Sequence, residues 1–155
     1  MPTGVEANMC RELTLSYDWS DVSVPAAARA HCHSQLTSLL PDADGRHALT
    51  YAADLVVSEL VTNAVNAGSS RVEVHLGVHR DHLRVAVGDD AAGLPALQEA
   101  GPTDARGRGL AIVAALSRSW GVERSELGKH VWALLPIAAP LAALVPCSLG
   151  PLDMP

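Results

Sequence analysis

Phenylalanine is absent from this 155-residue sequence, and aromatic residues as a whole make up only 3% of it. Apolar residues nevertheless reach 48% and charged residues 18%, a composition typical of a globular chain and not of a disordered one. A core must therefore be built from leucine, valine and alanine. The length suggests one domain that can bury such a core by itself.

Basic stripes and long apolar segments are also missing. The net charge is −6 and lysine and arginine do not cluster, which argues against direct nucleic-acid binding. The N-terminus carries an early glutamate and no long apolar run, so it does not resemble a signal peptide. Residues 137–149 are apolar but contain Pro140 and Pro146, and they are too few to span a bilayer as a helix. We therefore expect a cytoplasmic protein without a membrane partner.

Cysteine is scarce and odd in number. Cys10, Cys32 and Cys147 lie far apart in the sequence, which fits a reducing cytosol better than a disulfide framework. Cys32 stands between His31 and His33, but three adjacent residues of a helix cannot all face one ion. The simpler interpretation of this triplet is structural.

The pattern that remains predicts strands and helices in a clear order. Alternating apolar residues predict strands, and apolar residues three and four apart predict helices. The expected strands cover residues 13–17, 72–78, 83–87, 120–124 and 130–135, and the expected helices cover 25–40, 46–65 and 111–116. We divide the chain into an N-terminal segment with a short strand (1–24), a domain (25–136) and a Pro-rich tail (137–155).

Two polar side chains point to the sheltered side of the second predicted helix. Glu59 and Asn63 lie one turn apart, roughly 100–140° from an expected solvent stripe. That stripe consists of Asp54, Ser58 and Thr62. Buried polar groups need partners, because burying them unpaired is costly. Either Glu59 and Asn63 bond inside the protein, or they bind a ligand.

Asp89 has an unusual phase within its strand. Leu83, Val85 and Val87 define the core face, and Asp89 continues that series. An acid is rare at the end of a core face, although aspartate is also common in the turn just past a strand. Gly93 follows four residues later, where a glycine permits the backbone to approach a flat ligand closely.

A glycine-rich segment, Gly107-Arg108-Gly109-Leu110, leads into the helix expected at 111–116. Free backbone amides and the helix dipole make such a helix start a site for anions, although the same pattern also occurs at flexible helix starts. Before it, residues 94–106 form a predicted loop whose length is typical of a lid or binding loop.

Four short motifs now stand in one order: Glu59-x-x-x-Asn63, Asp89-x-x-x-Gly93-x-Pro95, Gly107-x-Gly109-Leu110 and Gly128-x-x-Val131-Trp132. The ordered set resembles the GHKL ATPase superfamily over residues 25–136, and in particular its small stand-alone members, the anti-sigma-factor serine/threonine kinases and related actinobacterial proteins. The resemblance implies a Bergerat ATP-binding fold. This is an α/β (α+β) two-layer sandwich with a mixed, mainly antiparallel sheet and helices on one face.

The resemblance also implies roles for individual residues. Glu59 should be the general base toward the attacking hydroxyl or water, and Asn63 should ligate the Mg²⁺ that accompanies ATP. Asp89 should accept a hydrogen bond from the adenine amino group. The other residues expected to contact the nucleotide are Asn66, Gly93, Gly107, Arg108, Gly109, Leu110 and His130. Asn66 is included because Ala67 stands where relatives carry a histidine, and His130 because it stands where they carry a threonine near adenine.

The resemblance implies an ATP-binding regulatory protein, for which three activities remain open. The first is an anti-sigma-type serine/threonine kinase that phosphorylates a small anti-anti-sigma (STAS-like) partner. The alternative is a nucleotide-sensing module that switches partners, a sigma factor among them, without phosphotransfer. The third is a degenerate scaffold that binds only protein. Relatives often dimerise, so a homodimer is a further expectation by analogy.

Overall fold

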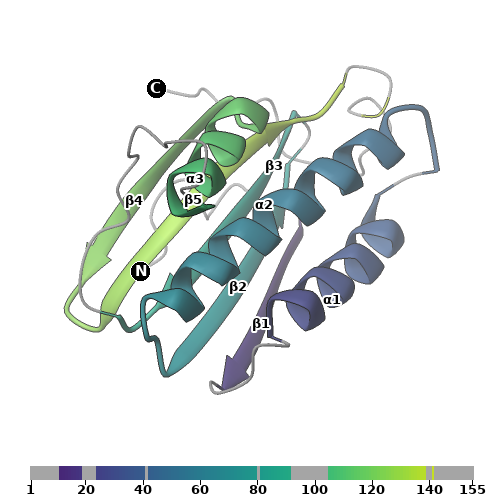
Figure 1. The fold of residues 1–155 in the computed structure, drawn as a ribbon. Coiled ribbons are helices and arrows are strands. Elements are labelled where there is room, and N and C mark those ends of the chain that lie inside the picture. The colour runs from purple at the N-terminus through teal and green to yellow at the C-terminus, as the bar shows by residue number, and fades with distance from the viewer. Residues whose placement is uncertain are drawn as a thin grey trace.

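A twisted antiparallel sheet forms one layer of the molecule, and helices on a single face of it form the other (Figure 1). The computed structural model describes residues 11–18, 24–40, 42–79, 81–91, 105–138 and 141. In these ranges the strands are β1 (Arg11–Asp18), β2 (Arg71–Val78), β3 (His82–Asp89), β4 (Ser119–Ser125) and β5 (Gly128–Pro136). The helices are α1 (Val24–Leu39), α2 (Arg46–Asn66) and α3 (Ala105–Leu116).

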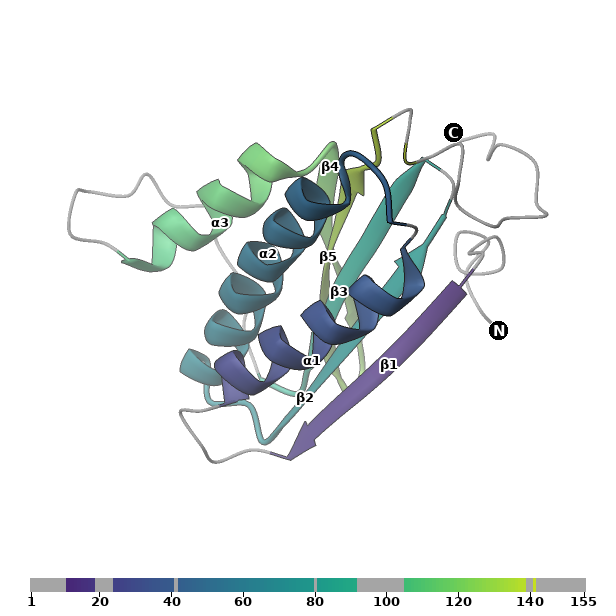
Figure 2. The ribbon, with the colours of Figure 1, turned by 90° about the vertical axis from the view of Figure 1, so that its right-hand side faces the viewer.

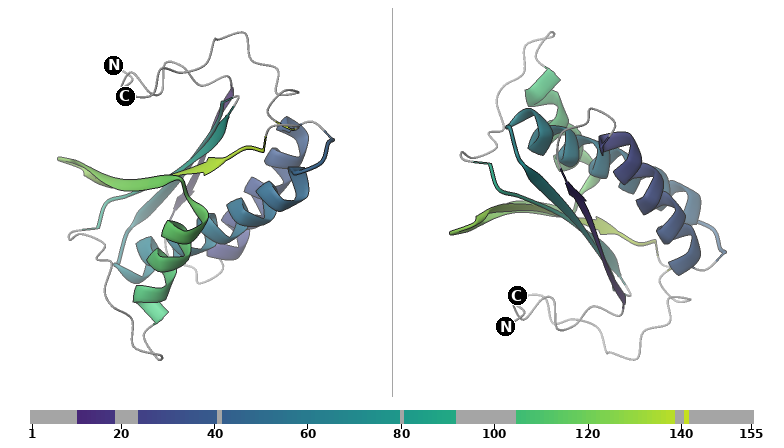
Figure 3. Two further views of the ribbon diagram at one scale, coloured as in Figure 1. Left: turned by 90° about the horizontal axis from the view of Figure 1, so that it is seen from above. Right: turned by 90° about the horizontal axis from the view of Figure 1, so that it is seen from below.

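The strands follow the order β1-β2-β3-β5-β4, and every neighbouring pair in the described part of the chain is antiparallel. Views along the sheet show α1, α2 and α3 on the same side of it (Figure 2, Figure 3). The predicted two-layer sandwich with helices on one face is therefore confirmed. Because β3 lies in the middle of the sheet and pairs with β2 and β5, its two ends are held on both sides.

The predicted limits of most elements agree with the structure, but α3 differs. It begins at Ala105, whereas the sequence predicts a helix from residue 111. The glycine-rich segment 107–110 therefore lies inside the helix and does not precede it. Glycine weakens a helix interior, which explains the wrong prediction, and packing against α2 compensates here. Residues 92–104, most of the predicted loop, and 142–155, most of the predicted tail, lie outside the described residues.

The C-terminus of α2 is fixed by a glycine cap. Gly68 has a φ of 85°, which favours a residue without Cβ. Its N–H donates to Val65 O at 3.0 Å, and the N–H of Ser69 donates to Ala64 O at 3.3 Å. These two bonds form a Schellman motif. The predicted helix stop near Gly68 is confirmed, and the cap returns the chain to the sheet at β2.

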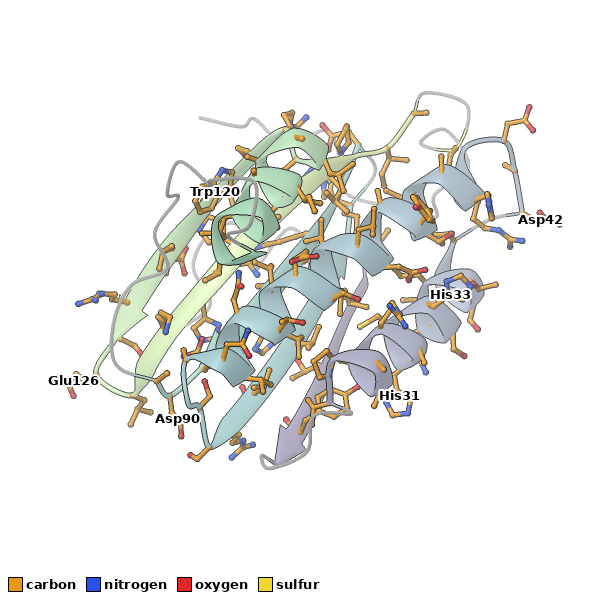
Figure 4. The ribbon with its side chains drawn as sticks, viewed as in Figure 1. His31, His33, Asp42, Asp90, Trp120 and Glu126 are labelled. Atoms are coloured by element: carbon orange, nitrogen blue, oxygen red, sulfur yellow. The ribbon has the colours of Figure 1, made fainter. Side chains whose placement is uncertain are left out.

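Leucine, valine and alanine fill the core between the helices and the sheet, as the composition requires. Cys32 belongs to this core, and burial raises the pKa of its thiol to about 12. His31 and His33 are exposed on α1 (Figure 4). Nδ1 of His31 lies 2.8 Å from Tyr17 Oη, and Nδ1 of His33 lies 2.9 Å from Asp54 Oδ2. The triplet 31–33 thus faces in different directions, in agreement with its structural interpretation.

The expected solvent stripe of α2 is only half exposed. Asp54, Ser58 and Thr62 are all half-buried, and the Oγ atom of Ser58 is buried without a hydrogen-bond partner. The prediction of a solvent-facing stripe is wrong, because α1 packs beside α2 along its length and covers part of that surface (Figure 1).

Candidate functional site

Glu59 and Asn63 extend from α2 toward α3 and meet it at Gly109. A Cβ atom placed on Gly109 would lie 2.6 Å from Glu59 Oε2 and 3.7 Å from Asn63 Oδ1. The missing side chain therefore allows the backbone of α3 to approach these two polar groups. Both are half-buried, and Nδ2 of Asn63 is buried without a hydrogen-bond partner. A buried amide left unpaired costs about 1–3 kcal/mol, a cost that a ligand with an acceptor oxygen would remove.

A buried ion pair lies at the C-terminal end of β3. Asp89 is the last residue of β3 and stands opposite Lys129 in β5. Lys129 Nζ donates to Asp89 Oδ1 at 2.9 Å, and the side chains are 7% and 3% exposed, respectively. The backbone N–H of Ala91 donates to the same oxygen at 2.9 Å. The phase that singled out Asp89 in the sequence thus places its carboxylate on the core side of the sheet.

Gly128 makes this pairing sterically feasible. A Cβ atom at this position would lie 1.9 Å from Asp89 O, and its φ is 149°, so that a larger residue would force the strands apart. The glycine of the fourth sequence motif therefore allows β5 to start in contact with the end of β3. This contact places Lys129 next to Asp89.

Lys129 is a site residue that the sequence analysis missed. It occupies the same face as Val131, Ala133 and Leu135, which alternate along β5 and are buried. The phase argument applied to Asp89 would have found it, since a lysine at the start of a core-facing series is as unusual as an aspartate at its end. The family resemblance points instead to the next residue, His130.

The structure turns the side chain of His130 to the opposite face of the sheet from that of Asp89. Neighbouring residues of a strand point to opposite faces, and His130 stands opposite Gly88, with its ring against the place where a Cβ of Gly88 would be. The ring of His75 in β2 lies 5.5 Å from it, centroid to centroid. His130 and Asp89 both border a surface hollow where β3 ends and β5 begins, but the ring of His130 is on the face of the sheet away from the helix that carries Glu59 and Asn63.

The remaining predicted residues are distributed unevenly. Asn66, the last residue of α2, is exposed and lines a surface hollow beside α1 with Pro25 and Arg29. Leu110 is buried in the core of the domain. Gly107 and Arg108 lie in the first turns of α3, where backbone N–H groups have no partner within the helix. Gly93 lies outside the described residues.

Asp90, next to Asp89, ties the end of β3 to the chain segment after α2. Its carboxylate accepts hydrogen bonds from the backbone N–H of Ser70 at 2.7 Å, from the Ser70 hydroxyl and from the N–H of Arg71. The hydrogen bonds from Ser70, the hydroxyl first, lower the pKa of Asp90 below its ordinary value. Figure 4 shows Asp90 near the C-terminal end of α2, so one anchor fixes α2 relative to Asp89.

Comparison with known proteins places these residues in a family context. Residues 23–135 match the family model described as the histidine kinase-like ATPase domain. The match extends from just before α1 nearly to the end of β5, and it includes Glu59, Asn63, Asp89 and Lys129. A search of curated proteins gave no match. Among the described helices, none is both long enough and apolar enough to cross a membrane.

Proposed function

This chain belongs to the histidine kinase-like ATPase family, and we propose that within it the chain is an ATP-dependent serine/threonine protein kinase of the anti-sigma type. Membership of the family supports ATP binding in a regulatory role. The proposed phosphoryl acceptor is a hydroxyl group of a small anti-anti-sigma (STAS-like) protein, and a sigma factor is a further proposed partner.

The observation that carries the proposal is the meeting of Glu59 and Asn63 at Gly109. The two side chains supply a carboxylate and an amide oxygen, which are the hard ligands that Mg²⁺ prefers. The unpartnered Nδ2 of Asn63 would find an acceptor in a phosphate oxygen. The residues present therefore fit a nucleotide bound with Mg²⁺, and Asn63 would hold the ion. When bound, Mg²⁺ would neutralise charge on the phosphates.

Glu59 is the proposed general base. It would accept the proton of the serine or threonine hydroxyl as that oxygen forms a bond to the γ-phosphorus of ATP. The bond between the γ-phosphorus and the β–γ bridging oxygen breaks in the same step, and ADP leaves. No hydrogen bond or ion pair holds the Glu59 carboxylate among the described residues, so it remains free to take this proton.

Asp89 is the proposed adenine contact. Lys129 and the N–H of Ala91 both use Oδ1 of the carboxylate, and among the described residues no donor reaches Oδ2. The second oxygen would therefore accept from the adenine amino group. In this proposal Lys129 is a positioning residue, because it fixes the carboxylate without being required to touch the phosphates.

The packing of α3 favours one alternative, a nucleotide-sensing module that switches partners without phosphotransfer. The backbone of α3 at Gly109 lies directly against the Glu59 carboxylate. The half-buried Glu59 carboxylate is thus covered in part by α3, and a group that binds beside it would press on this helix. Movement of α3 would itself be a signal that a partner could detect, even if no phosphoryl group is transferred.

Substitution of Glu59 by glutamine separates the two functions, because glutamine keeps the shape of the side chain and removes its basicity. We expect Glu59→Gln to bind ATP with near wild-type affinity and to lose transfer of the γ-phosphoryl group from labelled ATP to purified STAS-like proteins of the same organism. If the wild-type protein binds ATP but labels none of these proteins, the kinase proposal fails and the switching module is supported.

A further inference from the structure

Three side chains that commonly bind metals meet at the turn between β2 and β3, at the opposite end of β3 from Asp89. The rings of His79 and His82 are fully buried and stack with centroids 5.2 Å apart. Their Nδ1 atoms lie 3.3 Å and 2.7 Å from a single oxygen, Asp81 Oδ1. One ligand atom of each residue thus lies within 4.8 Å of the other two.

We propose that His79, Asp81 and His82 form a binding site for Zn²⁺ or a related first-row divalent ion, separate from the nucleotide site. Zn²⁺ binds imidazole nitrogen and carboxylate oxygen at about 2.0–2.2 Å, so that tetrahedral ligand atoms lie roughly 3.3 Å apart. The separation between His79 Nδ1 and Asp81 Oδ1 matches this value at 3.3 Å, whereas that between His82 Nδ1 and Asp81 Oδ1 is shorter at 2.7 Å, so a rotation of the side chains would be needed to surround an ion. Two imidazoles and one carboxylate leave a fourth position for water or another ligand.

The backbone holds these residues in place before any ion binds. The N–H of His79 donates to His82 O at 2.9 Å and closes the turn. The N–H of Ile137, just after β5, donates to Asp81 O at 3.0 Å. The turn is thereby anchored both to itself and to the neighbouring strand. Ligands fixed in this way lose little freedom when an ion binds.

Hydrogen bonding alone gives an incomplete account of this cluster. If the two rings served only to stabilise the turn, their Nδ1 atoms would form hydrogen bonds to a half-exposed carboxylate. Both Nε2 atoms would still be buried without a hydrogen-bond partner. Such orphaned atoms are rare, because each of them reduces stability. Coordination through Nδ1 would leave the Nε2 atoms as they are, but it is much stronger than a hydrogen bond to a half-exposed carboxylate and would offset their cost.

The charges around the site are compatible with a divalent ion. Arg118 is the one cation found beside Asp81 among the described residues, with Nη1 3.7 Å from Oδ2. It opposes a second positive charge, but it faces the oxygen that is turned away from the rings. In this position it also orients Oδ1 toward them, as an outer partner of a metal ligand does.

Titration calorimetry of the full chain with Zn²⁺, together with the absorption spectrum of the Co²⁺ form, tests the proposal. We expect one equivalent of Zn²⁺ and the visible bands of tetrahedral Co²⁺ without thiolate charge transfer. Asp81→Asn should weaken binding by at least about tenfold. The matched control is His33→Gln, which removes an exposed histidine–aspartate contact of 2.9 Å and should leave Zn²⁺ binding unchanged.

Asp81→Asn also alters the hydrogen bonding of the turn, so a second readout uses the unaltered chain. Long-range ¹H–¹⁵N spectra of the wild type should show the Nδ1 resonances of His79 and His82 shifting together on addition of one equivalent of Zn²⁺. The proposal is overturned if these resonances do not move at a several-fold excess of Zn²⁺. It is equally overturned if Asp81→Asn binds Zn²⁺ as tightly as the wild type.

Discussion

The two ends of β3 each place a carboxylate among buried polar groups, but they give it different partners. At one end Asp89 contacts the ammonium group of Lys129 at 2.9 Å, and both side chains are almost fully buried. At the other end Asp81 is half exposed and contacts two buried imidazoles. The first carboxylate pairs with a buried ammonium group, whereas the second contacts two imidazole rings and has its nearest cation, the exposed Arg118, at 3.7 Å.

This difference shows how donor type selects a ligand. The Asp89 carboxylate lies on the core side of the sheet, the side that α2 covers with Glu59 and Asn63, and the oxygen atoms of these three side chains suit a nucleotide with Mg²⁺. The Asp81 end offers two imidazole nitrogens, which suit Zn²⁺ or a similar ion. Two clusters that look alike in composition, each polar and partly buried, therefore call for different ligands and different tests.

The largest expected effect comes from breaking the Asp89 pair. Lys129→Met would leave the Asp89 carboxylate buried without its cation, and the free energy of unfolding should fall by about 3–5 kcal/mol. Urea denaturation measures this change. Arg71→Met is the matched control, because it removes an exposed ion pair with Glu73 of similar length, 3.0 Å, and should cost less than about 1 kcal/mol. Equal losses in the two variants would show that the buried pair has no special role.

The other end of β3 should respond to pH. Burial lowers the pKa of His82 below its ordinary value of 6.5. Between pH 6.5 and the pKa of His82 in the folded state, the unfolded chain binds a proton that the folded chain does not, so stability falls as the pH falls. Below pH 3.8 the Asp81 carboxylate acts in the same direction, because its pKa is lowered on folding. Burial raises this pKa, but hydrogen bonds and charge from His82, His79 and Arg118 outweigh burial.

One such proton changes the free energy of unfolding by at most about 1.4 kcal/mol per pH unit. Urea denaturation between pH 7 and the acid limit of folding, roughly the range in which histidines and carboxylates titrate, measures this slope. We expect His82→Gln to reduce the slope just below pH 6.5, the ordinary pKa of the ring, while Lys129→Met keeps it. If the pH dependence of the free energy of unfolding is unchanged in His82→Gln, then His82 is not the group that causes it.

The smallest expected effect on stability is that of Gly109→Ala. The new Cβ would collide with the flexible end of Glu59, which can move aside, and alanine is the better helix former by about 0.5–1 kcal/mol. The free energy of unfolding should therefore stay within about 1 kcal/mol of the wild type. Phosphotransfer should nevertheless decrease, because the Glu59 carboxylate is displaced.

A double-variant comparison identifies the cause of that decrease. If Gly109→Ala acts through Glu59, it should have little further effect on the rate of phosphotransfer in the Glu59→Gln background. A full additional loss in the double variant would show that Gly109 contributes to the site independently of Glu59.

Much of this arrangement could be predicted from the sequence, because it depends on local periodicity. The phase of Leu83, Val85 and Val87 located Asp89, and the glycine at position 68 marked the end of α2. Features that depend on contacts between segments far apart in the sequence were not predicted. The start of α3 at Ala105 depends on packing of Gly109 against α2, which outweighs the low helix propensity of the segment.

Two further differences have the same physical origin. The sequence alone does not give the register between β3 and β5, which pairs Asp89 with Lys129 and turns His130 to the other face. The segment 79–82 reads only as a turn, because the convergence of its two histidines on Asp81 depends on how the turn folds back on itself. Phase within a strand is readable from one chain segment, whereas a partner across the sheet is not.

Calorimetric titration with ATP, in Mg²⁺ and in EDTA, tests the central claim most directly. If Asn63 holds Mg²⁺ at a nucleotide site on this domain, the wild type should bind one equivalent of ATP more tightly in Mg²⁺ than in EDTA. Asn63→Ala should lose most of that difference while it keeps the weaker EDTA affinity. Absence of ATP binding to the wild type in Mg²⁺, or an Asn63→Ala variant with the full magnesium dependence, would contradict the account and leave Glu59 and Asn63 as structural residues.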